Sequence, residues 1–242
     1  MHIVCAQVLF FNKSRAEQLK CMYNTGMKME SIGIIISIRP FNERDAVAHI
    51  FTRDYGVMAG MLRGAVCARR GRPMVGMVGT VSWNARLDSQ LGVFHWEMRS
   101  NPAAAVMFSR DGVMIINSMF ALINTLLPER AAYTTLYDET INAIAKITNA
   151  PATTVYLEWE ISLLRELGYA LELSHCSGCG RHDNLNFLSP RTGRAVCDEC
   201  AAPYMNRVYK LPLNLAITAR FLANAATAQG TEMPAARTML KI

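Results

Sequence analysis

Four cysteines in the C-terminal half of the chain have the spacing of a metal site. They form two Cys-x-x-Cys pairs, Cys176 with Cys179 and Cys197 with Cys200, separated by seventeen residues. Each pair places two sulfur atoms on one tight turn, and two such pairs complete a tetrahedral four-thiolate site. This ligand set suits zinc or iron–sulfur chemistry, and two matched pairs are typical of zinc ribbons. The pattern therefore predicts a bound zinc ion.

Four thiolates predict a structural rather than a catalytic role for zinc, because they leave no coordination position for water. A thioredoxin-type redox role is disfavoured, since that motif needs a single pair in a βαβ context. Gly178 and Gly180 are expected to give the first turn its positive backbone angles. His175 and His182 flank this turn. Either could replace a sulfur ligand, but exposed loop positions are favoured for both.

A basic segment in the N-terminal half is the second chemical signal. Guanidinium groups bind phosphates bidentately, and the nearby Gly64 and Gly71 allow a backbone to approach closely. The alternative is that these arginines lie in a solvated loop that binds no phosphate. The net charge of +6 also favours a polyanionic partner. The candidate phosphate-contacting residues are Arg39, Arg44, Arg63, Arg69, Arg70 and Arg72.

Aromatic residues interleave with these arginines and are candidate platforms on which bases could stack. Packing in a hydrophobic core is the alternative for each of them, and it is favoured for any single one. They are Phe41, Tyr55, Trp83, Phe94 and Trp96.

The sequence contains no recognisable catalytic constellation. It lacks a Walker loop, a Gly-x-Ser-x-Gly elbow and a His-Glu-x-x-His helix. Glu43, Asp45 and Asp54 each stand beside an arginine, which predicts local ion pairing. His49 and His95 fall in predicted strands and are expected to be structural. A binding protein is therefore favoured over an enzyme.

The N-terminal half must supply the scaffold for the arginines, and its apolar residues alternate with a period of two. Five strands within about seventy residues, with no long helix, predict a small closed barrel. The five-stranded OB-fold is the commonest solution, and an SH3-like barrel is the alternative. The expected strands cover residues 32–39, 46–53, 57–64, 75–87 and 91–99.

The hydrophobic period changes to about 3.6 after residue 101, which predicts an all-helical second domain and an α+β fold overall. The cysteines then lie in a zinc-binding insertion at about 173–203. Residues 29–100 and 101–242 are the two expected domains, and residues 1–28 are expected to be a poorly ordered or upstream extension. The expected helices cover 103–127, 129–149, 153–167, 212–228 and 234–241.

Composition limits where the protein works. Seven scattered and paired cysteines do not resemble a disulfide framework, so a reducing cytoplasm is expected. The longest apolar stretch, 113–127, is interrupted by Asn117, Ser118 and Asn124, which favours a buried helix over a membrane span. The first eleven residues lack a basic leading region and a cleavage site, which disfavours a secretory signal.

Several segments resemble the RecO family of recombination mediators. Residues 34–36 (Ile-Ile-Ile), 42–45 (Asn-Glu-Arg-Asp) and 62–65 (Leu-Arg-Gly-Ala) resemble its opening. More distinctive are 163–169 (Leu-Leu-Arg-Glu-Leu-Gly-Tyr), which run into the first cysteine pair, and 187–193 (Phe-Leu-Ser-Pro-Arg-Thr-Gly) before the second.

The resemblance implies an N-terminal OB-fold, a helical C-terminal domain and, in many members, a zinc site made here by the four cysteines. It also implies a cytoplasmic, nucleoid-associated bacterial protein that binds single- and double-stranded DNA and anneals strands. Such a protein works with RecR and single-stranded-DNA-binding protein to load RecA. The alternative from the residues alone is a zinc-ribbon adaptor that binds proteins. A zinc hydrolase is disfavoured, because it requires an open coordination position.

Overall fold

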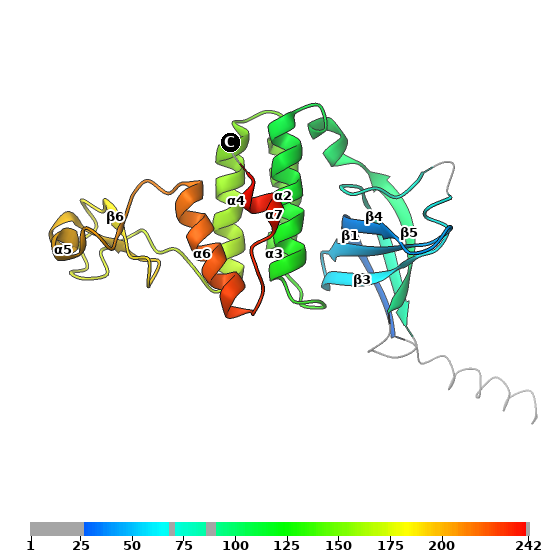
Figure 1. The fold of residues 1–242 in the computed structure, drawn as a ribbon, viewed down its shortest axis with the longest axis horizontal. Coiled ribbons are helices and arrows are strands. Elements are labelled where there is room, and N and C mark those ends of the chain that lie inside the picture. Colours follow the sequence, from blue (N-terminus) through cyan, green and yellow to red (C-terminus); the bar gives the residue numbers. More distant parts are fainter. Residues whose placement is uncertain (1–26, 68–70, 86–90, 241–242) are drawn as a thin grey trace, which may run out of the picture.

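A barrel, a helical bundle and a small cysteine-bearing module follow one another along the molecule (Figure 1). The computed structural model describes residues 27–67, 71–85 and 91–240. Most of the predicted N-terminal extension, together with Arg69 and Arg70, lies outside these residues. No helix in the described ranges is both long enough and apolar enough to span a membrane.

Five strands form a closed barrel in the order β1-β2-β3-β5-β4, which confirms the predicted OB-type fold. Among the described residues, the one parallel pairing between barrel strands joins β3 to β5 and covers three residue pairs, from Gly60↔Gly92 to Leu62↔Phe94. The strands are β1 (Met27–Pro40), β2 (Ala46–Thr52), β3 (Gly56–Leu62), β4 (Val78–Ala85) and β5 (Gly92–Ser100).

The first strand is longer than its sequence pattern indicates. It begins at Met27, which pairs with Ala85 of β4, so its first two residues precede the expected domain boundary at 29. These residues lack an alternating pattern, but the long β4 strand gives their backbone groups a partner. The hydrogen-bonded pairing of β1 with β4 therefore begins before the segment in which apolar residues alternate.

Buried residues occupy both faces of the first three strands. Ile35 and Ile50 fill the barrel interior, whereas Ile34, Phe51 and Val57 belong to a cluster shared with the helices. A strand that is covered on both faces has apolar residues at consecutive positions, which explains the consecutive isoleucines. The helical bundle therefore covers one outer face of the barrel.

The helical domain begins with a break that periodicity did not reveal. The predicted helix 103–127 divides into a 3-10 helix, η1 (Pro102–Val106), and α2 (Arg110–Leu126). Ser109 starts α2 as its N-cap, because its side chain accepts a hydrogen bond from the Gly112 amide at 3.2 Å. A side chain at Gly112 would collide with Val106, so the two helices meet closely there.

The remaining helices are close to those predicted, but α3 begins later and α7 ends earlier. They are α3 (Thr134–Lys146), α4 (Ala152–Glu166), α6 (Leu215–Ala228) and α7 (Ala235–Thr238). Residues before α3 contact the barrel instead of forming a helix: the Arg130 amide donates to the Val57 carbonyl at 2.9 Å. Gly168 ends α4 with a φ of +85°, as the sequence predicts.

A buried ion pair holds the short helix α7 in the bundle, where it lies between α2 and α4 (Figure 1). The Arg237 guanidinium donates to both carboxylate oxygens of Glu160 on α4, and to the Leu215 carbonyl at 2.7 Å. Thr218 of α6 donates to the same carboxylate at 2.5 Å. Glu160 is completely buried and Arg237 is 5% exposed, so the charges are shielded from water.

The barrel and the bundle are joined by polar contacts as well as by their common core. Arg53 after β2 donates two hydrogen bonds, both 2.9 Å long, to the carboxylate of Asp138 on α3. These hydrogen bonds lower the pKa of Asp138 below its ordinary value. Thr134 donates to the Arg53 carbonyl at 3.1 Å. The joint is therefore fixed by paired charges and backbone contacts.

Replacing Gly56 by alanine is expected to destabilise this joint by at least about 2 kcal/mol. Gly56 has a φ of +67°, and an added Cβ would lie 1.8 Å from the Ala131 carbonyl oxygen. Gly64 is a matched control, because its φ of +69° has the same strain but no atom of the described residues lies within 4 Å of an added Cβ. Urea unfolding should show a clearly smaller loss for Gly64→Ala, and equal losses would contradict the close contact.

The cysteine-bearing module is inserted between α4 and α6. Its three short strands form a sheet in the order β7-β6-β8. The last strand reaches Lys210, so the module extends beyond the predicted limit of about 203. Its elements are β6 (Phe187–Leu188), β7 (Ala195–Val196), α5 (Asp198–Ala201), η2 (Ala202–Tyr204) and β8 (Tyr209–Lys210).

Candidate functional site

The fold brings the four predicted cysteines together in one cluster. Their Sγ atoms all lie within 4.8 Å of one another, and those of Cys179 and Cys197 are 3.7 Å apart. Tetrahedral zinc with Zn–S bonds of about 2.3 Å separates its sulfur ligands by about 3.8 Å. The residues therefore fit a four-coordinate metal that prefers thiolates.

Backbone amides stabilise the thiolate form of Cys176 by donating hydrogen bonds to its sulfur. The amides of Cys197 and Gly178 donate to the Cys176 sulfur at 3.3 and 3.4 Å. The Cys197 amide is the main reason that the pKa of Cys176 falls to about 6. The neighbouring thiols, Cys197 first, raise the pKa of Cys200 to about 12. Four thiols this close cannot all ionise without a cation, which is what a metal supplies.

The two glycines of the first turn have different roles. Gly180 has a φ of +77°, as predicted. Gly178 does not have a positive φ, which corrects the sequence expectation; instead, an added Cβ would lie 3.0 Å from the Cys200 sulfur. The position needs glycine because the second cysteine pair approaches it closely.

Both flanking histidines lie outside the sulfur cluster. The His175 Nδ1 is 2.9 Å from the Ser174 hydroxyl, and the His182 Nδ1 is 2.8 Å from the Ser174 carbonyl oxygen. His182 is exposed and His175 is half-buried. The metal-ligating group found in the described residues consists of the cysteines alone.

One end of the barrel carries the predicted arginines that the structure describes. Arg39, Arg44, Arg63 and Arg72 are all exposed. The Val66 amide donates to the Arg44 carbonyl at 2.9 Å, which ties the β1–β2 loop to the loop after β3. The fold therefore brings Arg44 and Arg63, nineteen positions apart, to the same loop cluster.

Asp45 and Asp54, two of the three carboxylates expected to pair with a neighbouring arginine, have other hydrogen-bond partners, which corrects the predicted local pairing for these two. Asp45 accepts from the Gly64 amide at 2.9 Å and from Asn42 at 3.1 Å, and these bonds lower its pKa, with smaller contributions from the nearby arginine charges. Asp54 accepts from the Ser31 hydroxyl at 2.6 Å. Within the described ranges, no carboxylate lies within ion-pair distance of Arg44 or Arg63.

A groove of about 350 Å³ lies beside this cluster, where β5 continues past the end of β3. Arg63, Gly71, His95 and Trp96 are among the residues that line it. The Trp96 indole nitrogen is buried and has no hydrogen-bond partner in the described part of the chain. His95 is exposed here, although the sequence suggested only a structural role.

The candidate stacking residues divide into two groups. Trp83 and Phe94 are 1% and 3% exposed and belong to the barrel core, so neither can stack on a base. Trp83 also donates to the Ala59 carbonyl at 3.0 Å. Phe41, on the β1–β2 loop, is 63% exposed, and Trp96 lines the groove. Tyr55 is half-buried against the barrel core.

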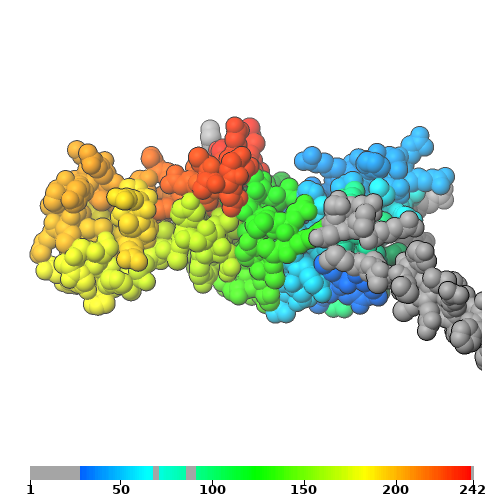
Figure 2. Space-filling model, turned by 90° about the horizontal axis from the view of Figure 1, so that it is seen from below, coloured from blue at the N-terminus to red at the C-terminus, as the bar shows by residue number. Residues whose placement is uncertain are grey.

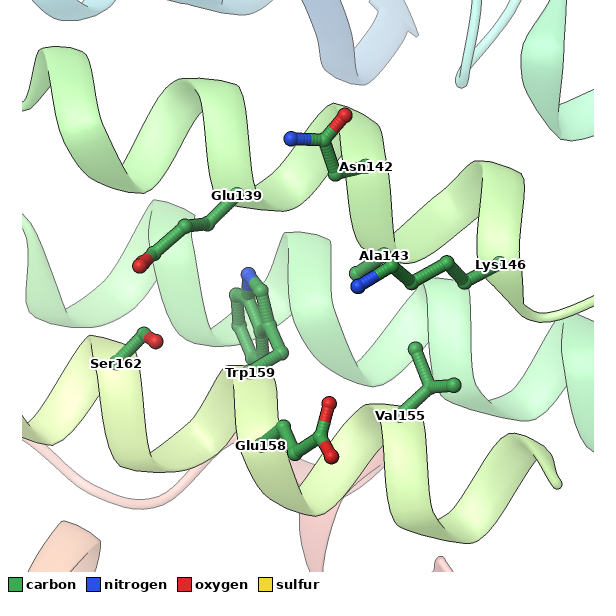
Figure 3. Close-up of a pocket in the computed structure, with 8 residues that line it drawn as sticks. All are labelled: Glu139, Asn142, Ala143, Lys146, Val155, Glu158, Trp159 and Ser162. Carbon is green, nitrogen blue, oxygen red and sulfur yellow. The ribbon is translucent and has the colours of Figure 1, made fainter. Parts of the chain in front are cut away.

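A second hollow, of about 190 Å³, lies between α3 and α4 on the bundle (Figure 3). Trp159 lies at its centre, with Glu139 and Ser162 toward one end and Lys146 toward the other. The Trp159 indole already donates to Thr140 at 2.9 Å, and Glu139 pairs with Arg165 at 3.2 Å. The second carboxylate oxygen of Glu139 is buried without a hydrogen-bond partner in the described residues, and the lining groups form no nucleophile–base arrangement.

Comparison with known proteins places both halves of the chain in one family. The family model described as "Recombination protein O N terminal" matches residues 27–98, and "Recombination protein O C terminal" matches residues 107–238. Together they cover the barrel and nearly the whole of the helical domain with its inserted module.

Similar proteins carry the name "DNA repair protein RecO". The protein from Dinoroseobacter shibae is 38% identical over 186 residues, which are 74% of this chain and 76% of the relative. That from Jannaschia sp. is 34% identical over 234 residues, or 88% of this chain and 95% of the relative. That from Cereibacter sphaeroides strain KD131 is 33% identical, with 88% and 97% covered. The chain therefore belongs to the RecO family of DNA repair proteins, which are non-enzymatic mediators.

Proposed function

We propose that this protein is a recombination mediator that binds single- and double-stranded DNA through the arginine-bearing end of its barrel. The observation that carries the proposal is that Arg44 and Arg63 are exposed beside a groove and have no carboxylate partner in the described ranges. Phosphates match the fork geometry of such arginines, and Trp96 and Phe41 offer faces for bases. Arg39, Arg72, Arg69 and Arg70 are assigned the same role.

Membership of the RecO family supports a more specific set of activities, which we include in the proposal. The protein anneals complementary strands and works with RecR and single-stranded-DNA-binding protein to load RecA onto DNA. The four cysteines hold a structural zinc ion, since four sulfur ligands close its coordination sphere. The adaptor alternative, in which the positive charge is incidental, predicts no dependence of DNA binding on these arginines.

Replacing Arg44 and Arg63 together by alanine is expected to weaken DNA binding and reduce its salt dependence. Each lost phosphate contact should flatten the slope of log affinity against log salt by about 0.7 on single strands and about 0.9 on duplex. Two contacts therefore predict a change of about 1.4 to 1.8, measured by fluorescence anisotropy over a range of salt concentrations. Oligonucleotides of different sequence should be affected alike, because phosphate contacts carry no sequence information.

The matched control removes two positive charges from the bundle instead. Lys146 and Arg165 are exposed on α3 and α4, away from the barrel groove. Their double replacement by alanine should leave the salt slope within error of the intact protein. If the Arg44 and Arg63 variant also kept its slope and affinity, DNA would bind elsewhere and the adaptor function would be favoured.

A further inference from the structure

The cysteine-bearing module has a groove of its own, of about 490 Å³, beside the metal cluster. Arg191 and Arg207 line it together with Tyr204, whose side chain is 56% exposed. Hydroxyl-bearing residues contribute the remaining polar lining: Ser177, Ser189 and Thr192. Gly178 and the metal-ligand candidate Cys200 also line this groove, whereas no barrel residue does.

The acidic residues of the module form their contacts with residues other than the two groove arginines. Glu199 accepts a hydrogen bond from Arg181 at 2.9 Å, and Asp198 accepts two from Asn186 at 3.0 Å. Arg181 also pairs with Asp183 at 3.7 Å. The carboxylates of the module are thus engaged away from the groove. None lines it, and none in the described ranges lies within ion-pair distance of either groove arginine.

This combination of groups fits one strand of nucleic acid. Two arginine forks suit successive phosphates, an exposed tyrosine ring suits an unstacked base, and hydroxyls hydrogen-bond sugar and phosphate oxygens. A duplex keeps its bases stacked and so cannot use the ring. We propose that this groove is a second binding site for single-stranded DNA. The proposal rests on the function proposed above, since it assumes that the barrel holds the first site.

The groove lies far from the barrel, so the two sites bind separate segments of single-stranded DNA. The module and the barrel lie at opposite ends of the molecule, with the helices between them (Figures 1 and 2). A short oligonucleotide on the barrel therefore cannot also reach the groove. The protein holds two separate single-stranded segments at once, as a protein that brings complementary strands together requires.

The test counts binding sites on the zinc-loaded protein. Oligothymidylates of about eight nucleotides are short enough to occupy a single site. Calorimetric titration at low salt should give two oligonucleotides per intact protein and one per Arg191→Ala/Arg207→Ala variant. The control is Arg194→Ala/Lys210→Ala, which removes two exposed positive charges from the same module outside the groove and should still bind two. Two sites in the groove variant would overturn the proposal.

A second variant separates stacking from charge. Tyr204→Ala removes an exposed ring that contributes little to the fold, and it should weaken the second site about fivefold or more while the first is unchanged. If the arginines served only to balance the charge of the zinc–thiolate cluster, the double variant would lose zinc and Tyr204→Ala would bind normally. That result would also overturn the proposal.

Failure of this proposal can be distinguished from failure of the barrel site. The Arg44→Ala/Arg63→Ala variant should keep the module site at its original affinity and bind a second oligonucleotide, at the barrel, more weakly, and a protein with all four replacements should keep only that weakened barrel binding. One site in the intact protein that depends on Arg44 and Arg63 supports the barrel and refutes the groove. If the single site depends on Arg191 and Arg207 instead, the groove is supported and the barrel site is refuted.

Discussion

Replacing Cys197 by serine is expected to abolish metal binding and unfold the cysteine-bearing module. Its sulfur is completely buried among the other ligands, and structural zinc supplies on the order of 10 kcal/mol of apparent folding free energy in small motifs. The module has only two-residue strands and a small apolar cluster of its own, so little else would hold it. Metal analysis by mass spectrometry and limited proteolysis between α4 and α6 would measure both effects.

Cys67→Ser is the matched control for this experiment. Cys67 is an exposed cysteine on the barrel, far in sequence from the cluster, so the same chemical change should leave metal content and proteolysis unaltered. The barrel signal in thermal melting should be similar in both variants. Intact protein that contains no stoichiometric metal, and that melts identically with a chelator, would show that the cluster is not a zinc site.

Replacing Arg237 by methionine is expected to cost about 3–5 kcal/mol of unfolding free energy. The change leaves the Glu160 carboxylate completely buried and without its guanidinium partner, although the Thr218 hydroxyl still donates to it. Replacing Glu160 and Arg237 together by methionine should cost far less than the two single changes summed, because no buried charge remains. Urea unfolding of the four proteins forms the required double-mutant cycle.

The exposed pair between Arg165 and Glu139 provides the comparison. These groups are 3.2 Å apart, with side chains 53% and 34% exposed, so Arg165→Met should cost less than about 1 kcal/mol. A loss below 1 kcal/mol for Arg237→Met, or strictly additive single changes, would show that the buried pair does not hold α7 in place.

Local signals explain why the barrel and the metal cluster could be predicted. The Cys-x-x-Cys turns are short-range features, and the period of two specifies strands without knowledge of the rest of the fold. The same period could also have assigned Trp83 and Phe94 to the core, because both are in register with interior residues such as Val81. The partial burial of Trp96 at the groove could not be predicted from its period, since it depends on where β3 ends.

Features that depend on distant residues could not be predicted from the pattern. Glu160 and Arg237 are separated by 77 positions, and neither stands out from the charged residues around it. The groove arginines Arg191 and Arg207 belong to different segments that meet only in the folded module. The break before α2 did have a local signal, the capping residue Ser109, but a continuous apolar stripe concealed it.

The cluster shared by the barrel and the helices determines how the chain can be divided. Ile34, Ile36, Phe51 and Val57 lie on the outer face of the barrel and are covered by the bundle. Cutting the chain near residue 101 would expose these four side chains to water as one apolar patch, which favours aggregation. Domain shuffling or expression of the barrel as a separate fragment would therefore require polar replacements on this face. The shared cluster therefore makes the stability of the barrel depend on the bundle.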